Sequence, residues 1–423
     1  MKSLKELYRI GKGPSSSHTM GPQRAAKLFL ERCGNASSYE VTLYGALAAT
    51  GKGHMTDVAI EEVLKKHIVH INWEPQTFLP FHPNGMKFVG KDLNGDIIDE
   101  WTVYSIGGGA LSDGIQGHEE LGADDVYDLH TMADIQKWCY ENGRAFWEYV
   151  EKCEDKDIWD YLRKVWETMK QSIRNGLNHE GVLPGPLKLQ RKAATYHIKA
   201  KGYRASLQSR GLVYSYALAV SEENASGGTI VTAPTCGACG VLPAVLYHMH
   251  TAHDMSEDRI LRALATAGLV GNIVKNNASI SGADVGCQGE VGVACAMASA
   301  AACQLFGGSP AQVEYAAEMG LEHHLGMTCD PVCGLVQIPC IERNAFAAAR
   351  ALDADLYASF SDGHHSVSFD RVVEVMRQTG HDLPSLYKET STGGLAQAYE
   401  QHMRKIAQEE SSSEENIGKF GYN

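Results

Sequence analysis

Residues 291–313 read Val291-Gly-Val-Ala-Cys-Ala-Met-Ala-Ser-Ala-Ala-Ala-Cys-Gln-Leu-Phe-Gly-Gly-Ser-Pro-Ala-Gln-Val313, a stretch without any Asp, Glu, Lys or Arg. Its length would suit a membrane span of ~20 residues. The stretch is nevertheless rich in Ala, Gly, Ser and Cys instead of Leu, Ile and Phe, and Gly307-Gly-Ser-Pro310 interrupts it. Small uncharged side chains let helices and loops of a protein interior approach closely. We therefore predict a buried helix over Val291–Leu305, and we interpret the similar stretch Ala225–Tyr247 as buried core, with no membrane segment in either.

Helical periodicity surrounds this stretch from Asp134 onward. The predicted helices are Ile135–Asn142, Ile158–Gly176, Leu212–Glu222, Glu257–Val274, Pro310–Gly326, Pro339–Ala351 and Phe369–Thr379. Only short segments such as Thr229–Thr232 look extended in this part of the chain. The second part of the chain is therefore expected to be mostly α-helical.

The first ~125 residues have a different character, because short alternating runs stand between helical segments. The predicted strands are Tyr39–Tyr44, His67–Trp73 and Ile97–Ile106, and the predicted helices are Gly21–Cys33 and Thr56–Lys66. A charged stretch over Asp155–Asp160 separates the two regimes. We expect an α/β (α+β) N-terminal domain, residues 1–155, and a mostly α-helical C-terminal domain, residues 156–423.

The composition limits the classes of partner. The net charge is −13, from 38 Lys and Arg residues against 51 Asp and Glu residues. Such an acidic chain is a poor match for nucleic acid or an anionic membrane surface, so neither is expected as a partner. Eleven cysteines in 423 residues do not make a disulfide framework, and the N-terminus has no apolar signal segment, which predicts a cytoplasmic protein with reduced thiols. Large two-domain metabolic enzymes often form symmetric pairs, so we expect a homodimer.

Several familiar signatures are absent from the sequence. Gly45–Gly53 resembles a phosphate-binding loop but has one residue too many between its glycines and lacks the magnesium-binding Ser or Thr. Gly107-Gly-Gly109 does not continue as a dinucleotide-binding pattern, because Ser112 stands at the third glycine position. There is no G-x-S-x-G elbow, which excludes that class of serine hydrolase, and no S-F-K-[I/V]-R-G lysine motif of a pyridoxal enzyme.

Hydroxyl groups gather before the predicted helix Gly21–Cys33, in the loop Ser15-Ser-Ser-His-Thr19. Thr19 is expected to cap that helix, and Pro22 is tolerated in its first turn. Free N–H groups at a helix start, together with several hydroxyls, suit a carboxylate or a phosphate. A plain capping loop uses the same residue types, so the residues alone leave both interpretations open. His54 stands in a glycine-rich turn, where a histidine serves as a base, a ligand or an ordinary polar group.

The cysteines divide into groups. Cys236-Gly-Ala-Cys239 is a C-x-x-C pair that would suit redox chemistry or half a zinc site, but it lacks a matching second pair. A sharper set stands at loop ends beside helix starts or breaks: Cys287, Cys329, Cys333 and Cys340. Thiolates near helix N-termini have lowered pKa values and bind metal readily. Their spacing is not the ferredoxin run, so spacing alone leaves zinc, an iron–sulfur cluster and coincidence open.

Longer motifs carry a family resemblance. They are Ser15-Ser-Ser-His-Thr-Met-Gly-Pro22, Tyr44-Gly-Ala-Leu-Ala-Ala-Thr-Gly-Lys-Gly-His54, Tyr104-Ser-Ile-Gly-Gly-Gly109, Asn277-Ala-Ser-Ile-Ser-Gly-Ala-Asp-Val-Gly-Cys287-Gln-Gly-Glu-Val-Gly292, Thr328-Cys329-Asp-Pro331 and Gln337-Ile-Pro-Cys340-Ile-Glu-Arg-Asn344. In this order they resemble the iron–sulfur L-serine ammonia-lyases (L-serine dehydratases). The resemblance covers about residues 1–395 and implies a single-chain form with a carboxylate-binding β-type domain followed by a helical iron–sulfur α-type domain.

The resemblance also implies a cofactor and roles for particular residues. A [4Fe–4S] cluster would be held by Cys287, Cys329 and Cys340, which leaves one iron without a cysteine. The substrate carboxylate would bind the loop formed by Ser15, Ser16, Ser17, His18 and Thr19. His54 and His18 are the catalytic candidates, with His54 as the base that removes the α-proton. Lys275, Asn277 and Arg343 are further candidates for substrate binding.

The implied reaction is the conversion of L-serine, a small-molecule amino acid, to pyruvate and ammonium by a carbon–oxygen lyase. The open iron would act as a Lewis acid on the hydroxyl, and a neutral imidazole would take the α-proton. A related lyase acting on L-threonine or L-cysteine is an alternative, because the sequence does not fix the leaving group. A zinc- or redox-type protein that uses Cys236, Cys239, Cys329 and Cys333 is another.

The chain departs from the family pattern at its end. Some members finish with a cysteine that caps the open iron in the resting enzyme. Here no cysteine follows Cys340, and the chain ends Phe420-Gly-Tyr-Asn423. Water or an internal thiol such as that of Cys333 would take the fourth position instead.

Overall fold

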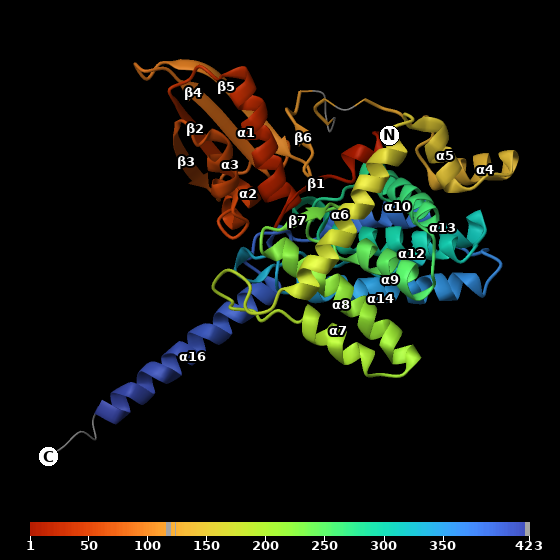
Figure 1. The fold of residues 1–423 in the computed structure, drawn as a ribbon. Coiled ribbons are helices and arrows are strands. Elements are labelled where there is room, and N and C mark those ends of the chain that lie inside the picture. The colour runs from red at the N-terminus through yellow and green to blue at the C-terminus, as the bar shows by residue number, and fades with distance from the viewer. Residues whose placement is uncertain (116–119, 123, 419–423) are drawn as a thin grey trace.

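The computed structural model describes residues 1–115, 120–122 and 124–418. A small lobe built on a β-sheet lies against a larger helical body (Figure 1). Side chains of the two parts form separate hydrophobic clusters. This arrangement confirms the predicted fold class, an α/β N-terminal part followed by a mostly helical remainder.

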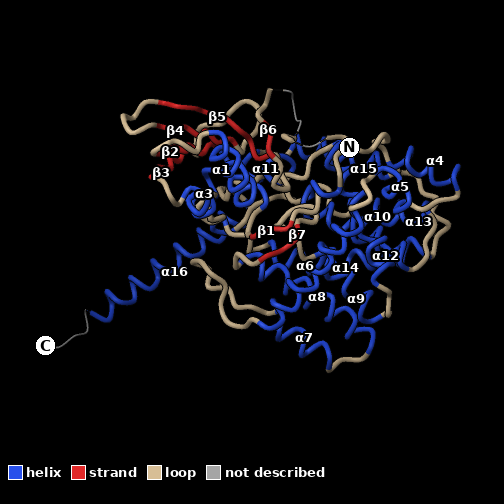
Figure 2. Tube along the Cα trace, turned by 45° about the horizontal axis from the view of Figure 1, so that its top comes forward, coloured by secondary structure: helices blue, strands red, loops and turns tan. Residues whose placement is uncertain are grey.

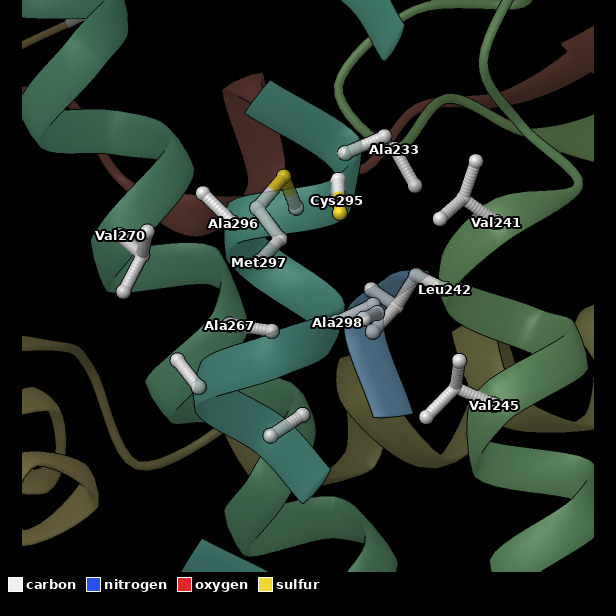
Figure 3. Close-up of a cluster of buried hydrophobic side chains, with 14 of the residues drawn as sticks. Ala233, Val241, Leu242, Val245, Ala267, Val270, Cys295, Ala296, Met297 and Ala298 are labelled. Carbon is white, nitrogen blue, oxygen red and sulfur yellow. The ribbon is translucent and has the colours of Figure 1, made fainter. Parts of the chain in front are cut away.

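Helix α12 (Val293–Leu305) lies at the centre of the helical body. It packs against α9 (Val241–Ala252), α10 (Glu257–Asn277), α13 (Pro310–Glu322) and α14 (Cys340–Ser359). Figure 3 shows Ala296, Met297 and Ala298 of α12 between side chains of α10 and α9. All α12 residues except Gln304 are buried, which confirms the buried helix predicted from the uncharged stretch. Among the described residues, no helix is both long enough and apolar enough for a membrane crossing.

Small residues let these helices approach closely. A Cβ atom added at Gly320 of α13 would lie 2.8 Å from Cα of Ala296 in α12. A Cβ atom at Gly176 of α6 (Ile158–Asn178) would lie 2.1 Å from the carbonyl oxygen of Ala219 in α8 (Ala205–Ala225). Neither position has room for a side chain. The scarcity of large apolar residues in the uncharged stretches therefore reflects tight helix–helix packing.

The remaining helical elements complete the body and its surface. They are η1 (Leu4–Glu6), α4 (Met132–Asn142), α5 (Phe146–Cys153), α7 (Ala193–Lys201), α11 (Gly282–Val285), η3 (Gln288–Gly292), η4 (Val332–Gly334), α15 (Phe369–Asp382), η5 (Ser385–Tyr387) and α16 (Gly394–Gly418). All seven helices predicted from the periodicity are present, and α5, α7, α9, α11 and α16 are further helices of the body that the periodicity did not predict. The last part of α16 extends away from the body (Figure 1).

The sheet of the small lobe has the strand order β3-β2-β4-β5-β6. The strands are β2 (Ser38–Tyr44), β3 (Ile68–Glu74), β4 (Gly85–Lys91), β5 (Ile97–Ser105) and β6 (Leu111–Ser112). Strands β2 and β3 are parallel, and the other neighbours are antiparallel. Helices α1 (Gly21–Arg32) and α3 (Thr56–Leu64) pack together on the sheet. Figure 2 shows these strands gathered on one side of the molecule, away from most helices.

The alternation of buried and partly buried side chains explains why these residues form a sheet. Strand β2 alternates buried and partly buried residues, and Tyr39, Val41 and Leu43 enter the core with Phe29 and Phe88. Three predicted strands match β2, β3 and β5. Strand β4 was not predicted, because glycines at Gly85 and Gly90 break its alternation of side chains.

The N-terminal residues belong to the helical body. Strand β1 (Ile10–Lys12) pairs antiparallel with β7 (Thr229–Val231), and the Tyr8 hydroxyl donates to the Leu264 carbonyl at 2.9 Å. The division of the chain at residues 155/156 stays a prediction, and side chains from both sides of it share the helical core. The chain leaves the body directly after β1, so the segment Ser15–Thr19 lies where the lobe and the body meet.

Candidate active site

Two of the three predicted cysteine ligands converge with a carboxylate. Cys287 precedes η3, Cys329 lies in the loop after α13, and both are buried. The Cys287 and Cys329 thiols lie 3.6 and 3.9 Å from Oε2 of Glu290, and one ligand atom of each residue falls within 4.8 Å of the others. Cys340, the first residue of α14, is partly buried and close enough to Cys287 for their charges to interact. These four side chains form one thiol and carboxylate cluster.

The electrostatics of this cluster favour a bound cationic group. A hydrogen bond that the Cys329 thiol donates to Cys287, together with burial, raises the pKa of Cys329, and burial and the charge of Cys287 raise that of Cys340. Burial and the charge of Glu389 raise the pKa of Glu290 to about 7. Several thiolates in one buried space repel each other unless a metal neutralises them. Two buried thiols beside a carboxylate, with Cys340 near enough to interact with Cys287, therefore fit a metal cofactor held by cysteines.

A second group lies beside the cluster and joins two predicted histidines to an unpredicted carboxylate. His18, His54 and Glu389 each bring a ligand atom within 4.8 Å of the others, and all three residues are buried. The rings of His18 and His54 lie 4.5 Å apart between centroids, and His18 Nδ1 lies 3.4 Å from Glu389 Oε1. Burial lowers the pKa of His18 to about 4 and, with the charge of His18, holds the pKa of His54 well below its ordinary value. Both imidazoles are therefore neutral near pH 7.

The loop Ser15–Thr19 forms a π-helical turn, η2 (Ser16–Met20), that runs directly into α1. The cap is Ser15, whose Oγ accepts from the His18 N–H at 3.1 Å. Thr19 is not the helix cap that we predicted, because its hydroxyl donates to the His54 carbonyl at 2.7 Å and thereby joins the loop to the His54 turn. Among the described residues, no hydrogen-bond acceptor is found for the backbone N–H groups of Ser16 and Ser17. Two buried donors at the start of a helix provide an anion site.

The C-terminal segment links the two groups. The Glu389 N–H donates to the Cys329 carbonyl at 2.7 Å, and the Cys329 N–H donates to the Tyr387 carbonyl at 2.8 Å. Burial and the charge of Cys287 raise the pKa of Glu389 to about 8. The cluster and the histidine pair therefore belong to one site, formed by residues of the small lobe and of the helical body.

Arg343 supports the Cys329 loop. Its Nη1 donates to the Thr328 carbonyl at 2.7 Å, and its Nη2 lies 3.6 Å from Asp330 Oδ1. The nearby thiols raise its pKa although burial alone would lower it. The structure thus places Arg343 close to the cysteine ligands, while its contact with substrate stays a prediction.

Lys275 and Asn277 have other contacts at the C-terminal end of α10. The Lys275 ammonium donates to Glu120 Oε2 at 2.8 Å, and Asn277 Nδ2 donates to the His130 carbonyl at 2.7 Å. Both line a cavity of about 910 Å³ that Lys388 also lines, next to Glu389 in sequence. Their proposed contact with substrate stays a prediction, and the contacts observed are structural ones.

Cys236 and Cys333, which the sequence left open, are not among the thiols that the described part of the chain groups with Glu290 within 4.8 Å. Cys236 is buried, and its N–H donates to Ser16 Oγ at 3.4 Å. Cys333 is exposed on η4. The carboxylates Glu290 and Glu389 are the site residues that sequence reasoning missed. Glu290 stood three residues after Cys287 inside a quoted motif, whereas no pattern signalled Glu389.

Glu120 is central to an ion-pair network between the lobe and the body. It is 3% exposed at its side chain and pairs with Arg9, Arg24 and Lys275. Burial would raise its pKa, but Lys275 and Arg9 lower it to about 2. A carboxylate with a lowered folded-state pKa stabilises the fold above its unfolded pKa of ~4.3 and loses that contribution as pH falls towards 2.

The replacement Glu120→Gln is expected to lower the free energy of unfolding by about 3–5 kcal/mol at pH 7, because it leaves buried cations unpaired. Urea unfolding at pH 7 and pH 3 measures this, and the difference from the unaltered protein should shrink at pH 3. The exposed Glu31→Gln is the matched control and should change the free energy by less than ~0.5 kcal/mol. Equal stability of the Glu120 and Glu31 variants at pH 7 would contradict the prediction.

Comparisons with known proteins identify the family of this chain. The family described as "Serine dehydratase alpha chain" matches residues 53–396, and "Serine dehydratase beta chain" matches residues 3–67. An "L-serine dehydratase" of Streptomyces coelicolor is 41% identical over 93% of this chain and 98% of its own length. "L-serine dehydratase 1" of Escherichia coli is 41% identical, and an "L-serine dehydratase" of Haemophilus influenzae is 40% identical, each over 94% of this chain and 99% of its own length. The chain therefore belongs to the serine dehydratase family of enzymes, with the alpha-chain and beta-chain regions joined in one polypeptide.

Proposed function

We propose that this chain is an L-serine ammonia-lyase that uses a [4Fe–4S] cluster to convert L-serine to pyruvate and ammonium. The observation that carries the proposal is the pairing of Cys287 and Cys329 around Glu290, with Cys340 near enough to interact with Cys287, beside the neutral His18–His54 pair. Relatives of about 40% identity named L-serine dehydratase support the choice of substrate. Serine is difficult to dehydrate because hydroxide is a poor leaving group, and a cluster with an open iron supplies a Lewis acid for that hydroxyl.

The carboxylate of the substrate is assigned to the Ser15–Thr19 loop. The N–H groups of Ser16 and Ser17 point to an anion because they are buried and have no acceptor among the described residues. The hydroxyls of Ser15 and Ser17 lie 3.3 Å apart and add further donors. This anchor also offsets the overall charge of −13, which would otherwise repel an anionic group.

His54 is assigned as the base. His18 has partners at both ring nitrogens, since Nδ1 lies 2.8 Å from Ser17 Oγ and Nε2 lies 3.2 Å from the Ala46 carbonyl. His54 Nδ1 is buried and has no partner among the described residues. A neutral imidazole with a free nitrogen accepts the α-proton as the bond from the β-carbon to the hydroxyl breaks, and that proton then converts the departing hydroxide to water. The 2-aminoacrylate released then tautomerises and hydrolyses to pyruvate and ammonium.

The observations support the two alternative functions, a zinc protein and a lyase with another substrate, to different degrees. A zinc protein built on Cys236, Cys239, Cys329 and Cys333 has little support, because Cys333 is exposed and the cysteines of the group within 4.8 Å are Cys287 and Cys329. A lyase acting on L-threonine or L-cysteine would use the same anchors, so it differs from the proposal only in the leaving group and its surroundings.

Anaerobic purification tests the proposal. We expect a brown protein with broad absorbance near 400 nm and about four iron and four sulfide per chain. Pyruvate formation should be fastest with L-serine when serine, threonine and cysteine are compared at equal concentration. A colourless protein with one zinc per chain would refute the cluster, and faster turnover of threonine or cysteine would refute the substrate assignment.

A further inference from the structure

The proposed function leaves one group of the substrate without a partner. It assigns the carboxylate to the Ser15–Thr19 loop, the hydroxyl to the open iron and the α-proton to His54. The α-ammonium group of serine has no assigned acceptor. A buried ammonium without a counter-charge is strongly destabilised, so an α-amino acid site of this kind needs an anion near the α-carbon.

Two glutamates, Glu290 and Glu389, lie in the site, and they differ in which carboxylate oxygens are free to accept a hydrogen bond. Oε1 of Glu290 accepts from the Thr235 hydroxyl at 2.8 Å, and Oε2 accepts from the thiols of Cys287 and Cys329. Glu389 has Oε1 near His18, at 3.4 Å, and the Ala283 backbone N–H also acts on its carboxylate, whereas its Oε2 is buried and has no hydrogen-bond partner among the described residues. Glu389 is therefore the carboxylate with a free acceptor oxygen in the site. Its raised pKa favours the neutral form near pH 7 in the empty site, and an ammonium group beside it would favour the ionised form.

The backbone holds Glu389 in place. Its φ of 60° is in the left-handed region, which costs a residue with a side chain of order 1 kcal/mol or more. The Cys329 carbonyl fixes the Glu389 N–H, and the Ser391 hydroxyl donates to the Pro331 carbonyl at 2.7 Å. Contacts on both sides of the residue thus maintain an unfavourable conformation. That conformation directs the carboxylate towards His18 and His54, away from solvent, at 6% exposure.

The position of Glu389 matches the missing contact. Its carboxylate lies beside His18 of the carboxylate-binding loop, and the charge of Cys287 in the thiol cluster also acts on it. A substrate held by its carboxylate at the Ser15–Thr19 loop and by its hydroxyl at the cluster has its α-carbon between these two anchors. Its ammonium group therefore lies in the same region. An ammonium group donates three hydrogen bonds and needs acceptors, which are scarce among the donor-rich serines of the loop.

We propose that Glu389 binds the α-ammonium group of the substrate through Oε2 and thereby selects α-amino acids over the corresponding 2-hydroxy acids. This inference rests on the proposed function, because it takes the Ser15–Thr19 loop as the carboxylate anchor. It makes Glu389 a specificity-determining residue that contacts substrate and takes no part in proton removal.

The test compares two unreactive ligands that differ only at the α-substituent. L-alanine keeps the ammonium group and L-lactate has a hydroxyl in its place, and neither has a β-leaving group. Equilibrium dialysis with the anaerobic holoenzyme should show tighter binding of L-alanine than of L-lactate. Glu389→Gln removes the charge at nearly constant shape, and it should weaken L-alanine binding by about 10- to 100-fold while changing L-lactate binding less than about 3-fold. Iron and sulfide content should stay the same in the variant.

Two further variants complete the test. Ser391→Ala alters the same segment without touching the carboxylate, and its ratio of alanine to lactate affinity should equal that of the unaltered enzyme. Glu389→Asp keeps the negative charge, so it should retain a preference for L-alanine, and it provides the measurement if the glutamine variant fails to fold. Equal binding of both ligands by the unaltered enzyme, an unchanged ratio in Glu389→Gln, or a lost preference in Glu389→Asp would overturn the inference. Failure of the proposed function is separate, since it appears as no pyruvate formation from L-serine by the unaltered enzyme.

Discussion

Replacing Cys340 by serine is expected to remove the cluster and the activity together. Cys340 is the first residue of α14 and interacts electrostatically with Cys287 and Glu290. A hydroxyl oxygen is a much poorer ligand for iron than a thiolate, so two cysteines would be left to hold the cluster. Cys333 does not replace it, because Cys333 is exposed on η4, outside the group that Cys287 and Cys329 form with Glu290. We expect iron per chain to fall from about four to below one, with pyruvate formation reduced by at least about 1000-fold.

Cys153→Ser is the matched control for this prediction. Cys153 ends α5 and lies 3.8 Å from an Asp128 oxygen, in a different part of the helical body. Its loss should change neither iron content nor the rate. Far-ultraviolet circular dichroism checks that both variants keep their helices. If Cys340→Ser retained full iron and full activity, the ligand assignment would be wrong.

Helices with clear periodicity could be predicted from the sequence, because the burial of one helical face constrains local residues. Helix α12 followed from the uncharged stretch alone, since an interior helix that contacts four others has no solvent-facing side. Strand β4 did not follow, because Gly85 and Gly90 remove the side chains whose alternation identifies a strand. In this case the neighbouring strands β2 and β5 supply the pairing that the local sequence does not indicate.

The site residues also divide into those that a local motif predicts and those that it does not. The hydroxyl loop and the cysteines occur in local motifs, so the resemblance pointed to Ser15–Thr19, His54 and Cys287. Thr19 was wrongly predicted as a helix cap, because its hydroxyl bonds to His54, 35 residues away in the chain. Glu389 has no local signal at all. It reaches the site through backbone pairing with Cys329, 60 residues earlier, and such long-range pairing is not encoded in any short window.

The second large effect is expected for His54→Ala, which should keep the cluster but lose turnover. His54 is 1% exposed, and its ring is tilted by 56° against that of His18. The three proposed cluster ligands are all cysteines, so His54 does not hold the cluster. Iron and sulfide per chain should therefore match the unaltered enzyme. Removal of a positioned general base lowers rates by about 100- to 10,000-fold, so we expect kcat to fall within that range while the KM for L-serine changes little. The exposed His364→Ala is the control and should leave kcat unchanged.

The pH dependence provides an independent check on the same base. Because burial and the charge of His18 hold the pKa of His54 well below its ordinary value of ~6.5, the ring stays neutral and ready to accept a proton. The rate should therefore show no loss from protonation of this group as pH falls from 8 to 6, and loss should begin only at more acidic pH. L-serine deuterated at the α-carbon should react more slowly than ordinary L-serine if proton removal limits the rate. A kcat for His54→Ala equal to that of the unaltered enzyme would exclude His54 as the base, and the neutral His18 beside it would become the next group to replace.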